Sequence, residues 1–105
     1  MGYVYLIEDI DNNRYKIGVT KNLKSRLKNL QTGNSNQIKL IYSFETEYPF
    51  RLEKMLHNRF NEFHYHNEWY DLDEESIKNF LNLCNELNNI IISLKDNHFF
   101  SKKLS

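Results

Sequence analysis

The sequence predicts a small α/β domain in which a three-stranded, mixed or antiparallel sheet is flanked by helices and completed by an added C-terminal helix. Two short runs of β-forming residues stand near the N-terminus, and three later segments repeat apolar residues at helical spacing. The length of 105 residues, with 40% apolar and 14% aromatic residues, suffices for one packed core. We therefore expect one domain over residues 1–95 and a flexible tail over residues 96–105.

A β-hairpin is expected first, because residues 3–7 and 15–20 are rich in β-formers and residues 11–13 favour a turn. We expect Tyr5 to lie opposite Lys16 and Leu6 opposite Tyr15, so that one face of the hairpin is apolar. The other face is the candidate working face, and it carries Tyr3, Tyr5, Lys16 and Gly18.

A short amphipathic helix should begin after Asn22, a good N-cap residue, and end at the stop signal of residues 32–34. Residues 38–44 predict a third strand, and Pro49 suits the first turn of a second helix. The side chains of this second helix that should face the core are Leu52, Leu56 and Phe60.

The last third of the chain begins with an aromatic and histidine-rich segment over residues 63–69, which predicts a loop. Trp69 and Tyr70 are expected in the core or at its rim rather than as base-stacking platforms. Asp73 can cap a third helix. Its buried side should carry Ile77, Leu81, Cys84, Leu87 and Ile91.

The charge is unevenly distributed although the formal net charge is zero. Residues 1–60 carry ten basic against six acidic side chains, and six of the ten basic ones lie between Arg14 and Lys28. This segment is either a solvated charged face or a surface that binds phosphate. Charge alone favours the first interpretation.

Several classes of protein are disfavoured. No apolar stretch approaches the roughly 20 residues of a transmembrane helix, and the N-terminus lacks a signal-peptide pattern. A single cysteine, Cys84, can form neither an intramolecular disulfide nor a cysteine-based zinc site. We expect a soluble, cytoplasmic protein without a membrane partner; a viral protein would act in the cytoplasm or nucleus of its host.

The tripeptides Tyr3-Val4-Tyr5 and Lys16-Ile17-Gly18 resemble the pair that names the GIY-YIG endonuclease family. The family places an arginine eight residues after the glycine, as Arg26 is here, and a metal-binding glutamate on the helix after the third strand, as Glu53 is here. The resemblance covers residues 2–72, and its phrases Tyr-Lys-Ile-Gly-Val-Thr, Leu-Gln-Thr-Gly-Asn, Leu-Glu-Lys-Met-Leu-His and Glu-Trp-Tyr are similar to a branch common in phages and large DNA viruses. Two positions depart from the family pattern: Tyr3 replaces its first glycine, and Lys16 replaces its second tyrosine.

The resemblance implies an endonuclease that hydrolyses DNA with Mg²⁺ or Mn²⁺ as cofactor. Such hydrolysis needs an activated water, stabilisation of charge on the phosphate and help for the departing oxygen. Arg26 would hold the phosphate through its planar fork, and Glu53 would bind the metal ion. Tyr5 would act as the base if Lys16 lies beside it in a desolvated site, and would otherwise orient a water molecule that the metal ionises.

His57 stands four residues after Glu53 and therefore on the same face of the helix. It would share the metal ion or, as we prefer, support the glutamate from behind. His64 and His66 would border the same site. The residues expected to contact the substrate are Tyr3, Gly18, Lys24 and Asn67.

Each of these side chains taken alone has an ordinary structural explanation, as a strand tyrosine, a surface charge or a core-edge histidine. Their joint occurrence in the family's order favours catalysis. Two alternatives stay open: a GIY-YIG-like module that binds nucleic acid without cutting it, and an interaction module whose basic stretch is incidental.

Overall fold

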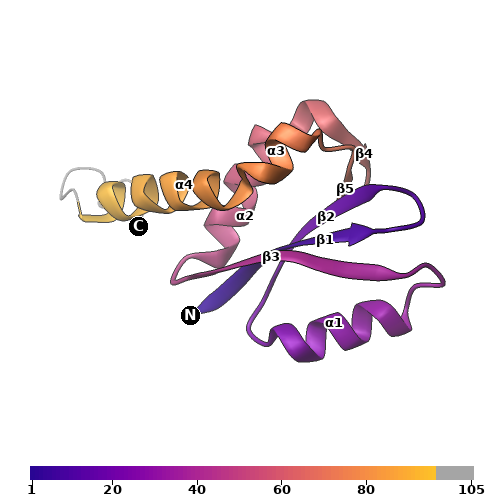
Figure 1. Cartoon of the computed structure of the whole chain (residues 1–105). Helices are drawn as coiled ribbons and strands as arrows, with labels where there is room; N and C mark the ends of the chain where they lie inside the picture. The colour runs from indigo at the N-terminus through magenta and orange to yellow at the C-terminus, as the bar shows by residue number, and fades with distance from the viewer. Residues whose placement is uncertain (97–105) are drawn as a thin grey trace.

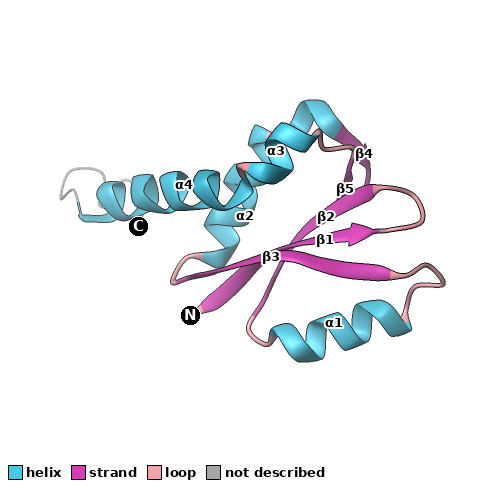
Figure 2. Ribbon diagram, viewed as in Figure 1, coloured by secondary structure: helices cyan, strands magenta, loops and turns pink. Residues whose placement is uncertain are grey.

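The structure is a computed structural model that describes residues 1–96, and it shows one antiparallel sheet with helices on both faces (Figures 1 and 2). Its strands follow the spatial order β3-β1-β2-β5-β4. The elements are β1 (Gly2–Asp9), β2 (Arg14–Thr20), α1 (Leu23–Thr32), β3 (Ile38–Thr46), α2 (Pro49–Arg59), the 3₁₀ helix η1 (Asn61–Phe63), β4 (His64–His66), β5 (Trp69–Tyr70), α3 (Glu74–Lys78) and α4 (Phe80–Asp96). The α/β class is confirmed, but the sheet has five strands rather than the expected three.

The hairpin of β1 and β2 is confirmed, but its expected register is wrong by two residues. Tyr5 lies opposite Gly18, and Lys16 lies opposite Ile7. Because side chains alternate between faces with a period of two, a shift of two leaves every side chain on the face that the sequence predicts. The error therefore changes the neighbours of Tyr5 and not the side of the sheet on which it lies.

The loop of this hairpin explains the shift. The Asp9 carboxylate accepts hydrogen bonds from the backbone N–H groups of Asp11 and Asn12, at 3.1 and 3.3 Å. Asn13 takes a left-handed conformation with φ of 53°, which asparagine tolerates better than most residues. Together these features hold a four-residue loop between Asp9 and Arg14, which close the ladder.

Helix α1 covers one face of the sheet, as Figure 1 shows. It begins as predicted, with the Asn22 side chain accepting a hydrogen bond from the Ser25 backbone N–H, and it ends at Gly33. Leu30 of this helix packs with Tyr5 and Ile7 of β1 in a small core. The working face expected from the sequence is thus partly a buried one.

The opposite face packs on α2 and α4, and the predicted inward residues of α2 are confirmed as buried. The expected single C-terminal helix is two helices, because Asp73 caps the short α3 and the chain turns at Asn79 before α4 begins. Cys84, Leu87 and Ile91 are buried as predicted, but Leu81 is 38% exposed and Phe80 takes the core position expected for it. The buried residues of α4 are Phe80, Cys84, Leu87 and Ile91.

Residues 63–69 are not the loop that the sequence predicts, because β4 and β5 form a second, short hairpin here. Strands of three and two residues are too short to display an alternating pattern. β5 joins the sheet through pairs of Tyr15 with Tyr70 and Lys16 with Trp69. Tyr70 is buried and Trp69 half-buried, as expected.

The expected flexible tail at residues 96–105 lies outside the described residues, apart from Asp96, the last residue of α4. In the described segment, residues 1–96, no helix combines the length and the apolar character needed to cross a bilayer.

Candidate active site

Tyr5 stands at the centre of the candidate site, on β1 beneath α1. Its side chain is almost fully buried, with 1% exposure. Gly18 lies opposite on β2, and a Cβ atom there would come within 2.3 Å of the Tyr5 hydroxyl oxygen. The Tyr5 ring therefore lies directly over Gly18, and only glycine leaves room for it. Sequence reasoning assigned Gly18 to the substrate, whereas its visible contact is with Tyr5.

Arg26 reaches Tyr5 from α1. Its Nε–H donates a hydrogen bond of 3.2 Å to the Tyr5 hydroxyl oxygen. This hydrogen bond, and the negative charge that the phenol can carry, raise the pKa of Arg26 above its ordinary value. Since Nε is engaged with Tyr5, the terminal nitrogens of the guanidinium remain as donors for an oxyanion.

Lys16 does not lie beside Tyr5, contrary to the expectation from the register. Its Nζ atom forms an ion pair with Glu68 Oε2 at 3.0 Å and lies 5.9 Å from the centre of the Trp69 ring. The cation in contact with the Tyr5 oxygen is Arg26. The role foreseen for Lys16 next to the phenol therefore falls to Arg26.

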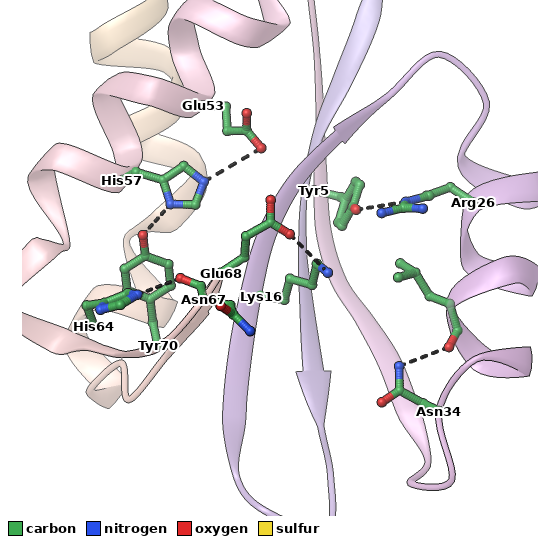
Figure 3. Close-up of polar contacts among 11 residues, drawn as sticks. Tyr5, Lys16, Arg26, Asn34, Glu53, His57, His64, Asn67, Glu68 and Tyr70 are labelled. Carbon is green, nitrogen blue, oxygen red and sulfur yellow. Dashed lines mark hydrogen bonds and ion pairs between the residues drawn. The ribbon is translucent and has the colours of Figure 1, made fainter.

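Glu53 and His57 project from α2 toward Tyr70, as Figure 3 shows. The carboxylate Oε2 of Glu53 lies 3.6 Å from Nε2 of His57. The other ring nitrogen, Nδ1, shares a short hydrogen bond with the Tyr70 hydroxyl. Burial, followed by the negative charges of Glu53 and Glu68, raises the pKa of Tyr70 above its ordinary value. Tyr70 therefore keeps its proton and can act as a donor.

The two groups lie on opposite faces of the sheet, because α2 packs on one face and Tyr5 lies in the core beneath α1 on the other. Because β5 pairs with β2 only at Tyr15 and Lys16, the edge from Ile17 to Thr20 is open in the described part of the chain. Figure 3 shows the Glu53 group on one side of this strand and the Tyr5–Arg26 contact on the other, with Glu68 between them. The Glu68 carboxylate is paired with Lys16, and its charge contributes to the raised pKa of both Arg26 and Tyr70.

The donor set of this site suits one kind of metal ion. Residues 1–96 contain no group of three or more His, Cys, Asp or Glu side chains that could hold a metal. Glu53, whose side chain is 20% exposed, is a single carboxylate backed by His57. Zn²⁺ needs three or four protein ligands, but Mg²⁺ keeps several waters and binds through one or two carboxylates. The residues present therefore fit a largely hydrated divalent cation.

The remaining predicted residues lie around this centre. Tyr3 is half-buried on the same strand face as Tyr5, and Lys24 is exposed in the first turn of α1. Asn67 forms the tip of the β4–β5 hairpin with φ of 53°, and its carbonyl contacts Nε2 of His64 at 2.5 Å. At the stop signal that follows α1, the Asn34 side chain donates a hydrogen bond of 3.0 Å to the Leu30 carbonyl and so satisfies the end of the helix.

Sequence reasoning missed Glu68 as a site residue, and it assigned Tyr70 only to the core. Both belong to the Glu-Trp-Tyr phrase that contributed to the family resemblance. Their positions follow from the pairing of β5 with β2, which puts Glu68 beside Lys16 and points Tyr70 at His57. The Glu-Trp-Tyr motif pointed to these residues, but their contacts with Lys16 and His57 depend on the sheet and could not be predicted from the sequence.

A groove of about 480 Å³ lies away from this centre, between the end of α2 and the helices α3 and α4. Its charged lining residues are Arg59, Glu62, Glu75 and Glu86. A lining with three carboxylates and one guanidinium disfavours a phosphate, so this groove is not a candidate for the substrate.

Together these observations define a small α/β domain in which a buried phenol is hydrogen-bonded to a guanidinium on one face of the sheet, and a carboxylate lies beside a histidine on the other. The chain belongs to the T5orf172 domain family, whose model matches residues 2–85. This domain is found in phage proteins and is related to homing and GIY-YIG-like endonucleases. The match extends beyond the expected residues 2–72 into α4. No curated protein and no solved structure matches the chain.

Proposed function

We propose that this protein is an endonuclease of the GIY-YIG type that hydrolyses DNA phosphodiester bonds with the help of Mg²⁺ or Mn²⁺. The observation that carries the proposal is the hydrogen bond from Arg26 to the buried hydroxyl of Tyr5, beside an edge of β2 that β5 leaves open, with Glu53 on the other side of this strand (Figure 3). A buried phenol needs a hydrogen-bond partner, and here the partner is a guanidinium whose terminal nitrogens can still donate to a phosphate. Relation to GIY-YIG-like endonucleases supports the same conclusion.

Tyr5 acts as the base, or orients the attacking water, under the influence of Arg26. A negative charge on the phenolic oxygen is stabilised by a guanidinium at a distance near 4 Å by about 4 kcal/mol at an effective dielectric near 20. The burial of Tyr5 limits the screening by water that would reduce this attraction to about 1 kcal/mol, but it also disfavours the charged phenol, so the guanidinium offsets part of that cost. The same guanidinium holds a nonbridging phosphate oxygen with its terminal nitrogens.

Glu53 would hold the metal ion, and His57 would support the carboxylate from behind. A bound divalent cation neutralises charge that develops on the departing 3′ oxygen. The free oxygen of Glu53 is the one available for this ion, since Oε2 faces His57. The role of His57 is thus to orient Glu53 rather than to share the metal.

DNA would enter along the open edge of β2. Exposed Lys24 on α1 and Asn67 at the hairpin tip lie on elements that border this edge, and we assign them to backbone contacts, with Tyr3 beside Tyr5. Phosphate contacts position a protein on DNA without reading its bases. We therefore expect low sequence preference.

Cleavage of several DNA forms with Mg²⁺ or Mn²⁺ tests the proposal. Wild type should cut, and Glu53→Ala and Arg26→Ala should each lose at least about 100-fold in rate. Glu86→Ala and Arg59→Ala are matched controls, because both residues are exposed and line the groove away from the site. Equal activity of Arg26→Ala and Arg59→Ala would refute the assignment.

A module that binds nucleic acid without cutting it is the second candidate. It is favoured over cleavage by the position of Lys16, which pairs with Glu68 instead of lying beside the Tyr5 phenol. Salt-dependent DNA binding, without cleavage by wild type at any metal concentration, would establish it.

A further inference from the structure

We infer that Tyr70 is a positioning residue that sets the orientation of Glu53 through His57, and so tunes the affinity of this carboxylate for a divalent cation. This inference rests on the proposed function. Tyr70 belongs neither to the family match's assigned residues nor to the proposed catalytic residues. Its role would also explain the short β4–β5 hairpin, which the sequence did not predict.

The side chains of Tyr70, His57 and Glu53 contact one another in that order. The Tyr70 hydroxyl meets Nδ1 of His57, and Nε2 of the same ring faces Glu53 Oε2 at 3.6 Å. At 3.6 Å this is an electrostatic contact rather than a hydrogen bond, and a carboxylate attracts the ring nitrogen that carries a hydrogen, so we place a hydrogen on Nε2. In the arrangement that we infer, Nδ1 accepts the hydrogen bond and the Tyr70 hydroxyl donates it. Tyr70 thereby selects one of the two tautomers of His57.

The position of Tyr70 is fixed by packing. It is 3% exposed and lies in β5, where it pairs with Tyr15 of β2. The His64 ring meets it edge to face, with ring centres 5.5 Å apart. The hydroxyl consequently has little freedom to leave Nδ1, and the ring that it holds is itself 75% shielded from water, with 25% side-chain exposure.

The protonated state of Tyr70 agrees with this direction of donation. Burial and two neighbouring carboxylates raise the pKa of Tyr70, so the phenol remains a donor at neutral pH. Groups that support a metal ligand from behind commonly contribute about 10- to 100-fold to metal affinity. We expect the loss of the Tyr70 hydroxyl to weaken cation binding by about tenfold, at the lower end of that range.

The test compares Tyr70→Phe with Tyr15→Phe. Tyr15 is the paired tyrosine on β2, it is also buried, and its hydroxyl contacts Glu8 at 3.2 Å at the far end of the hairpin. Each variant loses one buried hydroxyl and keeps its ring. Two measurements are made on the full chain: the tautomer of His57 by ¹⁵N NMR, and the dissociation constant of Mn²⁺ by titration without DNA.

The inference expects wild type and Tyr15→Phe to hold His57 as the Nε2–H tautomer and to bind Mn²⁺ equally. Tyr70→Phe should show mixed tautomers and a dissociation constant about tenfold higher. An Nδ1–H ring in wild type, or equal Mn²⁺ affinity in Tyr70→Phe and Tyr15→Phe, overturns the inference. Failure of wild type to bind Mn²⁺ while His57 remains Nε2–H refutes the metal site itself, and is distinguishable by the NMR signal.

Discussion

Replacement of Gly18 by alanine tests the geometry on which the site depends. The added Cβ atom would lie 2.3 Å from the Tyr5 hydroxyl oxygen and 2.5 Å from its Cζ atom, distances that no real contact tolerates. The Tyr5 ring cannot easily yield, because it is buried between β2 and α1 and is held by Arg26. Overpacked cores typically lose about 1–3 kcal/mol, and we expect Gly18→Ala to lose about 2–3 kcal/mol.

Thermal and urea unfolding measure this loss, which for a domain of this size corresponds to a fall in Tm of about 4 °C per kcal/mol. Gly33→Ala is the matched control, since its nearest heavy atom would be 3.5 Å away and its φ is −82°. At such a site alanine stabilises by about 0.4–1 kcal/mol through the unfolded chain. The two glycine variants should therefore change stability in opposite directions.

A second substitution separates the ring from its hydroxyl. Tyr5→Phe removes the oxygen at 2.3 Å, but its Cζ atom would still lie 2.5 Å from the new Cβ. The phenylalanine should hence recover only part of the stability lost in Gly18→Ala. A Gly18→Ala variant within about 0.5 kcal/mol of wild type, which is ordinary for surface substitutions, would refute the placement of Tyr5 over Gly18.

Three further measurements follow from the structure. Arg26→Lys should lower the cleavage rate by about 100-fold, with little change in Tm, because lysine keeps the charge but loses the fork that joins the Tyr5 oxygen to a phosphate. Burial raises the pKa of Cys84 from 9.0 to about 12, so the thiol of the unfolded chain loses its proton first. The free energy of unfolding should then be unaffected by this thiol below pH 9.0 and fall by about 1.4 kcal/mol per pH unit above it, a slope that Cys84→Ala abolishes in urea titrations. Burial acts to raise the pKa of Asp9, but hydrogen bonds from Asn12 and Asn36 lower it below 3.8, so Asp9 stabilises the fold above that pH and ceases to do so as pH falls through its folded pKa. Asp9→Asn should cost about 1–2 kcal/mol at neutral pH and flatten the acid dependence of Tm.

The features that sequence could predict are those with a period or a local signature. Alternation in the first hairpin assigned Tyr5 to the correct face, and the cap at Asn22 located the start of α1. The register was beyond the same reasoning, because it is set by hydrogen bonds of the Asp9 side chain within the loop. Those hydrogen bonds set the length of the loop, and they have no counterpart in the pattern of apolar residues.

The β4–β5 hairpin escaped prediction for a different reason. β5 pairs with β2, and β4 pairs with β5. The two strands together have only five residues, too few for an alternating hydrophobic pattern to indicate a strand. The consequence reaches the candidate site, since this hairpin brings Glu68 to Lys16 and Tyr70 to His57. The sequence could identify the family's chemical groups, but their pairing depended on a non-local contact.

The short length of β5 has a functional consequence. Were β5 to continue along β2 as far as Gly18, its backbone would cover the edge of β2 at the residue that lies opposite Tyr5. The observed pairing of β5 with Tyr15 and Lys16 instead holds Tyr70 in place. It leaves the following residues of β2 on this edge open to a phosphate. The short β5 therefore supports His57 through Tyr70, and its early end leaves the edge of β2 accessible. Lengthening the β4–β5 hairpin by a pair of residues should then abolish cleavage while the Nε2–H tautomer of His57 persists.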